Sequence, residues 1–135
     1  MQRDRRKVKN RQESGRFCLI PHSVLDYPGY VGLNYSARAM LLELVRRYNG
    51  INNGDISAPY SQLRHRGFAS KGTISNALKQ LLSARLIVAS RDWQFYNRNS
   101  YCALYALGWR PIDDCDGKHD LAPTNVAPHS YRQLS

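Results

Sequence analysis

Small polar and basic side chains between residues 70 and 80 carry the clearest chemistry of this sequence. At about 100° per residue they lie along the outside of one predicted helix, away from its apolar face. Amide side chains can pair bidentately with adenine, lysine can reach guanine or a phosphate, and the free N–H groups at a helix start favour an anion. No acidic residue interrupts this stripe. We therefore predict DNA contacts from Ser70, Lys71, Thr73, Ser75, Asn76, Lys79 and Gln80.

Two further groups of side chains flank this stripe. Arg64 and Arg66 precede it and are expected to face phosphate. The polar and aromatic segment 91–99 follows it and can reach a minor groove or a phosphate. The alternative for that segment is a local aromatic cluster or a dimer contact. Its candidate residues are Trp93, Phe95, Tyr96 and Arg98.

The elements that must position these residues begin with an amphipathic helix predicted from about residue 37 to 48. Its apolar residues recur at i, i+3, i+4, i+7, i+8 and i+11, which is one face of a helix. Asn34 or Ser36 can cap its start, and Asn49-Gly50 ends it. The apolar positions are Ala37, Met40, Leu41, Leu44, Val45 and Tyr48.

Two shorter helices are predicted to follow. The second spans about 59–66, with Pro59 in its first turn, and Gly67 closes it because the turn needs a positive φ. The third runs from Lys71 to about Ala84, with Ser70 as its N-cap. The third helix therefore carries the polar stripe on its outer face.

The remaining elements are short. Val24 and Leu25 fit one helical turn before a chain turn at 27–30, and residues 55–57 fit a small strand after a turn at 52–54. The β-prone runs 86–89 and 100–107 predict two strands of a hairpin joined by the segment 91–99. Helix, short strand, helix, tight turn, helix and hairpin is the order of a winged helix-turn-helix. We expect an α+β fold of that type, with a three-helix core and a hairpin wing.

The charge is uneven along the 135 residues, whose net charge is +10. Residues 1–16 carry seven basic and two acidic residues and predict a disordered basic arm, which can lie along DNA or remain a solvated tail. Residues 17–110 form the predicted domain. Residues 111–135 carry two basic and four acidic residues and three prolines, and predict an irregular tail. The net charge of +10 indicates an anionic partner. Nucleic acid is the first expectation, and an anionic membrane is the second.

Several other classes of protein are excluded by composition and spacing. No apolar run approaches the ~18 residues that span a bilayer, and no hydrophobic region follows the basic N-terminus as in a secretory signal. The three cysteines are odd in number and far apart, which argues against a disulfide scaffold or zinc site; we expect reduced thiols, two of them near the core. No motif predicts a catalytic residue, metal or cofactor, and the acidic residues between 113 and 120 lack calcium-loop spacing.

Two resemblances add to this reading. Residues 56–107 resemble winged-helix domains of bacterial and phage transcription regulators, in which a Ser-x-x-x-Ile-x-x-x-Leu-x-x-Leu pattern precedes the wing. Such domains usually have glycine where Ala84 or Arg85 ends the third helix here. About two-thirds of the chain is also similar to small helix-turn-helix proteins of prophages and mobile elements of proteobacteria. The segments that carry this second resemblance are 17–20, 52–55, 66–68, 104–109 and 111–113.

The resemblance implies a phage or mobile-element regulator of transcription or replication that binds double-stranded DNA in the bacterial cytoplasm, at the nucleoid. The alternative is a phage-encoded module that binds and inhibits a host nucleic-acid-binding complex, such as a defence system, through its wing and tail. Single-stranded nucleic acid, stacked on the aromatic residues of the wing, is a third possibility. The oligomeric state, monomer or homodimer, is left open by the sequence.

Overall fold

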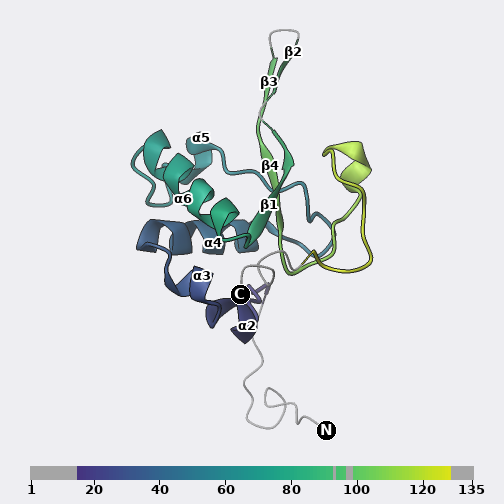
Figure 1. Cartoon of the computed structure of the whole chain (residues 1–135). Helices are drawn as coiled ribbons and strands as arrows, with labels where there is room; N and C mark the ends of the chain where they lie inside the picture. The colour runs from purple at the N-terminus through teal and green to yellow at the C-terminus, as the bar shows by residue number, and fades with distance from the viewer. Residues whose placement is uncertain (1–14, 93, 97–98, 129–135) are drawn as a thin grey trace, which may run out of the picture.

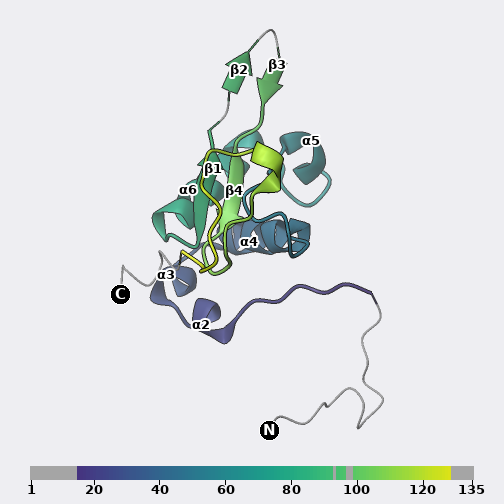
Figure 2. The same ribbon diagram turned by 90° about the vertical axis from the view of Figure 1, so that its right-hand side faces the viewer.

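The computed structural model describes residues 15–92, 94–96 and 99–128, with only the backbone described for 94–96 and 99–101. Within these residues the chain is α+β, as predicted, with five α-helices and an antiparallel hairpin (Figures 1 and 2). The helices are α2 (His22–Leu25), α3 (Pro28–Val31), α4 (Tyr35–Arg47), α5 (Tyr60–Leu63) and α6 (Lys71–Ser83). The strands are β1 (Ile87–Arg91), β2 (Gln94–Tyr96), β3 (Asn99–Tyr101) and β4 (Leu104–Leu107), followed by the 3-10 turn η1 (Cys115–Gly117).

The two long helices α4 and α6 pack against each other through the apolar faces that their sequences predict. Each begins at a side-chain cap: the Ala37 N–H donates to Asn34 Oδ1 at 2.9 Å, and the Thr73 N–H donates to Ser70 Oγ at 3.1 Å. The first of these bonds decides between Asn34 and Ser36 as the cap of α4. The buried residues along this contact are Ala37, Met40, Leu41 and Leu44 of α4 and Ile74, Ala77 and Leu81 of α6.

Three short elements differ from the prediction. The expected turn at 27–30 is instead the start of α3, because Pro28 occupies the first helical position, where its missing N–H costs nothing. The second helix is shorter than 59–66: Pro59 is an extended N-cap, and α5 gives way to a turn that Gly67 closes at φ +96°. The expected strand at 55–57 is a single bridge between Ile56 and Tyr105.

The hairpin is built in two tiers. β1 pairs with β4, and the register shifts between Ala89 and Arg91, so that Ser90 forms a bulge. β2 then pairs with β3, so the segment predicted as a connection is itself a small ladder. In both views this outer tier extends beyond the helices, on the side of the molecule opposite α2 and α3 (Figures 1 and 2).

A fully buried asparagine joins the hairpin to the chain that follows it. The side chain of Asn53 accepts a hydrogen bond from the Leu107 N–H at 2.7 Å through Oδ1. Its Nδ2 group donates to the carbonyl oxygens of Leu107, Arg110 and Pro111 at 3.1, 3.1 and 2.9 Å. Its backbone N–H donates to Asp113 Oδ2 at 2.7 Å, and its carbonyl accepts from the Asp113 N–H at 2.9 Å. One residue therefore bonds five backbone groups between residues 107 and 113.

The described part of the expected C-terminal tail, residues 111–128, has one 3-10 turn and is otherwise irregular, yet it packs on the body of the molecule. Ile112 and His119 are only 3% and 7% exposed. His119 Nε2 lies 2.6 Å from the Asp113 carbonyl, and His119 Nδ1 accepts from the Leu121 N–H at 3.1 Å, which together define the Nε2–H tautomer. The Asp120 N–H donates to the carbonyl of the bulge residue Ser90 at 2.8 Å.

Arg85 ends α6 in the left-handed conformation, with φ +58°. The Arg85 N–H donates to the Leu82 carbonyl at 3.0 Å and the Leu86 N–H to the Leu81 carbonyl at 3.1 Å, which is a Schellman motif. The arginine therefore occupies the left-handed position that glycine most often takes at a helix end. Gly108 closes over this turn, because a Cβ there would lie 3.0 Å from the Arg85 and Leu86 carbonyl oxygens.

The cysteines are less buried than expected. Cys18 and Cys102 are exposed and Cys115 is half-buried, so the prediction that two of them lie near the core is wrong. Burial, with the charges of Asp55 and Asp113, raises the pKa of the Cys115 thiol.

Among the described residues, no helix has the length and apolar character needed to cross a bilayer.

Replacing Asn53 with alanine should lower the free energy of unfolding by more than about 3 kcal/mol, because four backbone groups lose their buried partner. Urea unfolding followed by circular dichroism measures this. Asn49→Ala is the matched control: Asn49 is exposed, its side chain accepts one bond from the Ile51 N–H, and its loss should cost less than about 1 kcal/mol. Equal losses for the two variants would contradict the role of Asn53.

Arg85→Gly should be more stable than Arg85→Ala by about 1 kcal/mol, because only glycine relieves the left-handed backbone while both changes remove the side chain. The comparison of the two variants isolates the backbone from any contact of the arginine. Thermal and urea unfolding of the pair give the value. A stability that is the same for both would mean that residue 85 leaves the left-handed region in solution.

Candidate nucleic-acid interface

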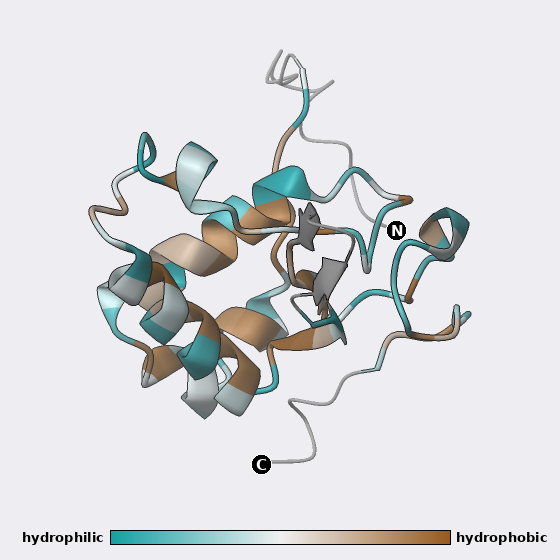
Figure 3. Cartoon of the chain, turned by 90° about the horizontal axis from the view of Figure 1, so that it is seen from above, coloured by the Kyte–Doolittle hydropathy of each residue, from teal (hydrophilic) through white to brown (hydrophobic). Residues whose placement is uncertain are grey.

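The outer face of α6 is open to solvent. Its exposed residues include four members of the predicted stripe and one glycine: Lys71, Gly72, Ser75, Asn76 and Lys79. Figure 3 shows teal, white and brown segments within the same helices, so each long helix carries both hydrophilic and hydrophobic residues. We call this surface the α6 face; it consists of the five residues just named.

Two residues of the predicted stripe hold the helix start instead of facing outward freely. Ser70 Oγ accepts the Thr73 N–H and lies 3.0 Å from Thr73 Oγ1, so both hydroxyls are used within the cap. The N–H groups of Lys71 and Gly72 have no hydrogen-bond partner within the described residues, which is normal for the first positions of a helix. Those two N–H groups are the donors that remain for an anion.

Gln80 is directed toward α4. The Asn34 N–H donates to Gln80 Oε1 at 3.2 Å, and Gln80 is half-buried. In this position its amide oxygen is occupied, so the expected bidentate pairing with adenine is not available to it. Asn76 is exposed and makes no hydrogen bond within the described part of the chain, which leaves it as the one open carboxamide of the stripe.

Lys71 occupies an unusual place for a cation. It is the first residue of α6, where the positive end of the helix dipole disfavours positive charge. Its ammonium group lies 5.7 Å from the centre of the Tyr60 ring of α5. An anion bound at this end would be attracted by the ammonium group, the helix end and the two open N–H groups together.

Arg66 is already paired. Its Nε and Nη2 atoms donate to the two carboxylate oxygens of Glu43 at 2.8 and 3.1 Å, and Arg64 Nε donates to His65 Nε2 at 3.2 Å. The prediction that Arg66 faces phosphate stays a prediction, and a phosphate there would compete with Glu43 for the guanidinium. Arg46 and Arg47 of α4, which are not among the predicted contact residues, border the same hollow of about 280 Å³ together with Gln62.

The arginines favour the ionised form of Glu43. The hydrogen bond from Arg66, with the charges of Arg66, Arg47 and Arg46, lowers the pKa of the Glu43 carboxyl below its ordinary value of 4.5, against the opposite effect of partial burial. The cluster of Glu43, Arg46, Arg47 and Arg66 thus carries three positive charges and one negative charge at neutral pH. It remains cationic after its internal pairing.

The predicted wing residues are only partly described. Phe95 and Tyr96 lie in β2, where the backbone alone is described, and Trp93, Arg98 and the basic residues of 1–14 lie outside the described residues.

Sequence reasoning missed Arg91 at the base of the wing. Its Nε and Nη2 donate to the Cys102 carbonyl at 3.3 and 2.7 Å, and its Nη1 donates to the Lys118 carbonyl at 3.0 Å. This guanidinium therefore holds the joint between the two tiers against the C-terminal segment.

Across the described ranges, no three His, Cys, Asp or Glu side chains are grouped so that they could hold a metal ion. Comparison of the chain with protein-family models, with curated proteins and with solved structures gave no match.

Glu43→Gln should lower the free energy of unfolding at pH 7 by less than about 1 kcal/mol, because solvent screens the ion pair on the side of Arg66, whose side chain is 52% exposed, although that of Glu43 is 14% exposed. A lowered pKa means that the ionised carboxylate stabilises the fold above pH 4.5, and that this contribution is lost as the pH falls through the pKa of the folded state. The difference between the two proteins should therefore shrink between pH 5 and pH 3. Urea unfolding across that range measures this difference in free energy. A difference that does not depend on pH would contradict the pairing. A difference of the same size when Glu43→Gln is made in the Arg66→Gln protein would also contradict it.

Proposed function

We propose that the chain is a winged helix-turn-helix protein that binds duplex DNA. In this proposal α5, the turn closed by Gly67 and α6 form the helix-turn-helix, and α6 lies in the major groove. The two-tier hairpin is the wing, which contacts the DNA backbone or minor groove beside α6. The observation that carries the proposal is the α6 face: five exposed residues in which two lysines, a free carboxamide and two open N–H groups occur without an acidic residue.

The packing supports this assignment of roles. Leu63 of α5 and Phe68 of the turn are 0% and 3% exposed, so α5 and the turn are held against the core while α6 keeps one side open. Lys71 and Lys79 lie at the two ends of the α6 face, eight residues apart, and suit backbone phosphates. Asn76 lies between them, where a helix in the groove brings a side chain to base edges.

The net charge of +10 supports an anionic macromolecule as the partner. The outer tier of the hairpin extends past the helices, which gives a second surface that can meet an elongated partner (Figure 1). With the resemblance of residues 56–107 to regulators of phages and bacteria, we propose a role in the control of transcription or replication of a phage or mobile element, at the nucleoid.

A second candidate function rests on a different surface. Val31 of α3 and Tyr35 and Leu42 of α4 are 58%, 85% and 52% exposed, on elements that lie away from the wing. Exposed apolar side chains in one region are typical of protein contacts. In this alternative the chain binds a host protein complex through α3 and α4, and DNA binding is weak or absent.

Fluorescence anisotropy with a random 30-base-pair duplex over a salt series tests the first proposal. Lys71→Gln/Lys79→Gln should reduce the slope of log K against log salt by about 1.8, because two phosphate contacts are lost. Arg110→Gln/Lys118→Gln removes the same charge outside the α6 face and should leave the slope within about 0.5 of the unchanged protein.

Three outcomes would count against the proposal. No duplex binding at low salt would favour the protein-binding alternative, which affinity capture from a host lysate would then address. Tighter binding of the single strand than of the duplex would indicate stacking in place of groove recognition. An equal loss in the two double variants would show that charge alone, and not the α6 face, governs binding.

A further inference from the structure

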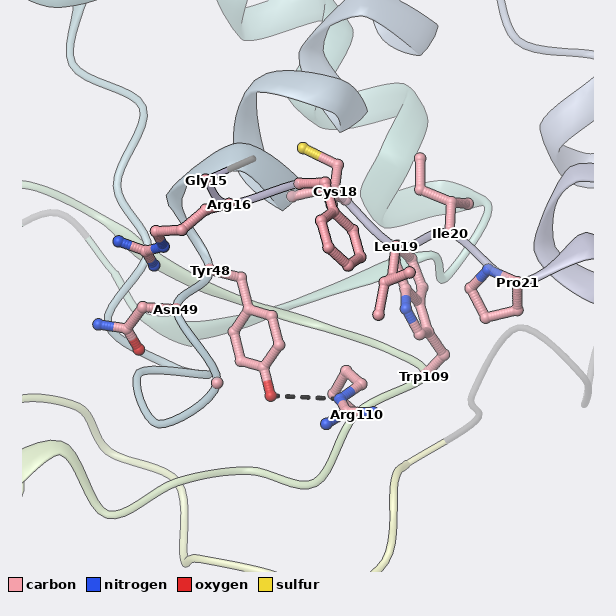
Figure 4. A pocket seen from close by; sticks show the side chains of 13 residues that line it. Gly15, Arg16, Cys18, Leu19, Ile20, Pro21, Tyr48, Asn49, Trp109 and Arg110 are labelled. Carbon is pink, nitrogen blue, oxygen red and sulfur yellow. Dashed lines mark hydrogen bonds between the residues drawn. The ribbon is translucent and has the colours of Figure 1, made fainter. Parts of the chain in front are cut away.

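A cavity of about 660 Å³ lies between the segment that enters the domain and the end of α4. Residues 15–21 cross over Tyr48 and Trp109, with Arg16 on the side of Tyr48 and Asn49, and Leu19 on the side of Trp109 (Figure 4). We call this the entry cavity. It is separate from the α6 face, since none of the five residues of that face lines it.

The walls of the entry cavity are apolar but incompletely covered. Val45 and Trp109 form its inner wall and are 4% and 7% exposed. Phe17 and Leu19 form its outer wall and are 58% and 72% exposed. Large apolar side chains this exposed, gathered at one hollow, indicate a surface that a further molecule covers. The volume lies within the range of about 300–1,000 Å³ that small-molecule sites occupy.

The polar groups at this cavity are of one sign. Its charged residues are Arg16 and Arg110, and no acidic residue lines it. Arg110 Nε donates to the Tyr48 hydroxyl at 3.2 Å, and its guanidinium carbon lies 5.6 Å from the centre of the Tyr48 ring. The stacked ring and this bond orient the guanidinium, while its two Nη groups have no partner within the described residues. A guanidinium held in this way presents the donor fork that carboxylates fit.

We propose that the entry cavity binds a small amphipathic anion: a molecule with an apolar or aromatic body and one carboxylate. The body would lie against Phe17, Leu19 and Trp109, and the carboxylate would accept hydrogen bonds from the Nη groups of Arg110, with Arg16 adding a second positive charge. Charge complementarity and volume favour this occupant over a second copy of the chain, which carries the same positive charge.

The probe for the test is 8-anilinonaphthalene-1-sulfonate, an aromatic anion whose fluorescence rises in apolar surroundings. The protein carries Trp93→Phe, so that Trp109 is the one remaining tryptophan and energy transfer from it reports the entry cavity. We expect one probe per chain. Arg110→Gln and Arg16→Gln should each weaken binding, Arg110→Gln by about tenfold. Arg46→Gln removes the same charge from α4 outside the cavity and should change the affinity by less than about twofold.

The neutral analogue N-phenyl-1-naphthylamine separates charge from apolar contact, and its affinity should not depend on Arg110. Thermal melting confirms that each variant is folded before titration. Equal affinity of the anionic probe for all the variants, or several probes per chain, would overturn the proposal. Light scattering that shows a dimer whose dissociation opens the cavity would also overturn it and assign the cavity to a second copy. None of these outcomes depends on DNA binding.

Discussion

The carboxamide of Asn53 is the interaction on which the rest of the structure depends. Backbone groups that are buried without a partner cost free energy, and the chain that leaves β4 runs past the core without forming regular structure. Asn53 satisfies both the N–H and the carbonyl of Leu107 and then the carbonyls of Arg110 and Pro111. This arrangement allows an irregular segment to lie against the molecule, and it also fixes where the hairpin begins its outward course.

The position of Asn53 also affects the hairpin. The neighbouring Gly54 carbonyl accepts a bond from the Ser90 hydroxyl at 2.6 Å, so the same turn that holds β4 also holds the bulge of β1. Arg91 then ties the next joint of the hairpin to the C-terminal segment. The direction of the hairpin is therefore set by side chains at its base. The α6 face, in contrast, is placed by apolar packing on α4.

The regular part of the fold could be predicted from the sequence because its determinants are local. The apolar periodicity and caps of α4 and α6 locate both helices to within one or two residues. The same reasoning predicts Arg66 and Gln80 as interface residues. It cannot detect their hydrogen-bond partners, the Glu43 carboxylate and the Asn34 N–H, because these residues lie far away along the chain. For the same reason, the sequence predicts only a turn at Asn53. Asn-Asn-Gly is typical of a turn, and no neighbouring residue indicates which carbonyl groups will accept hydrogen bonds from the Asn53 side chain.

The long span of the Asn53 contacts also bears on how the chain folds during synthesis. Its partners lie 54 to 60 residues later, beyond every helix from α2 to α6. While α5 and α6, the helices that follow Asn53, leave the ribosome, these partners of the carboxamide have not yet been synthesised. Contacts of such separation form late, because the loop between them must close first. The nascent chain would therefore carry an open core edge until residues 107–113 emerge, and only then could its fold be completed.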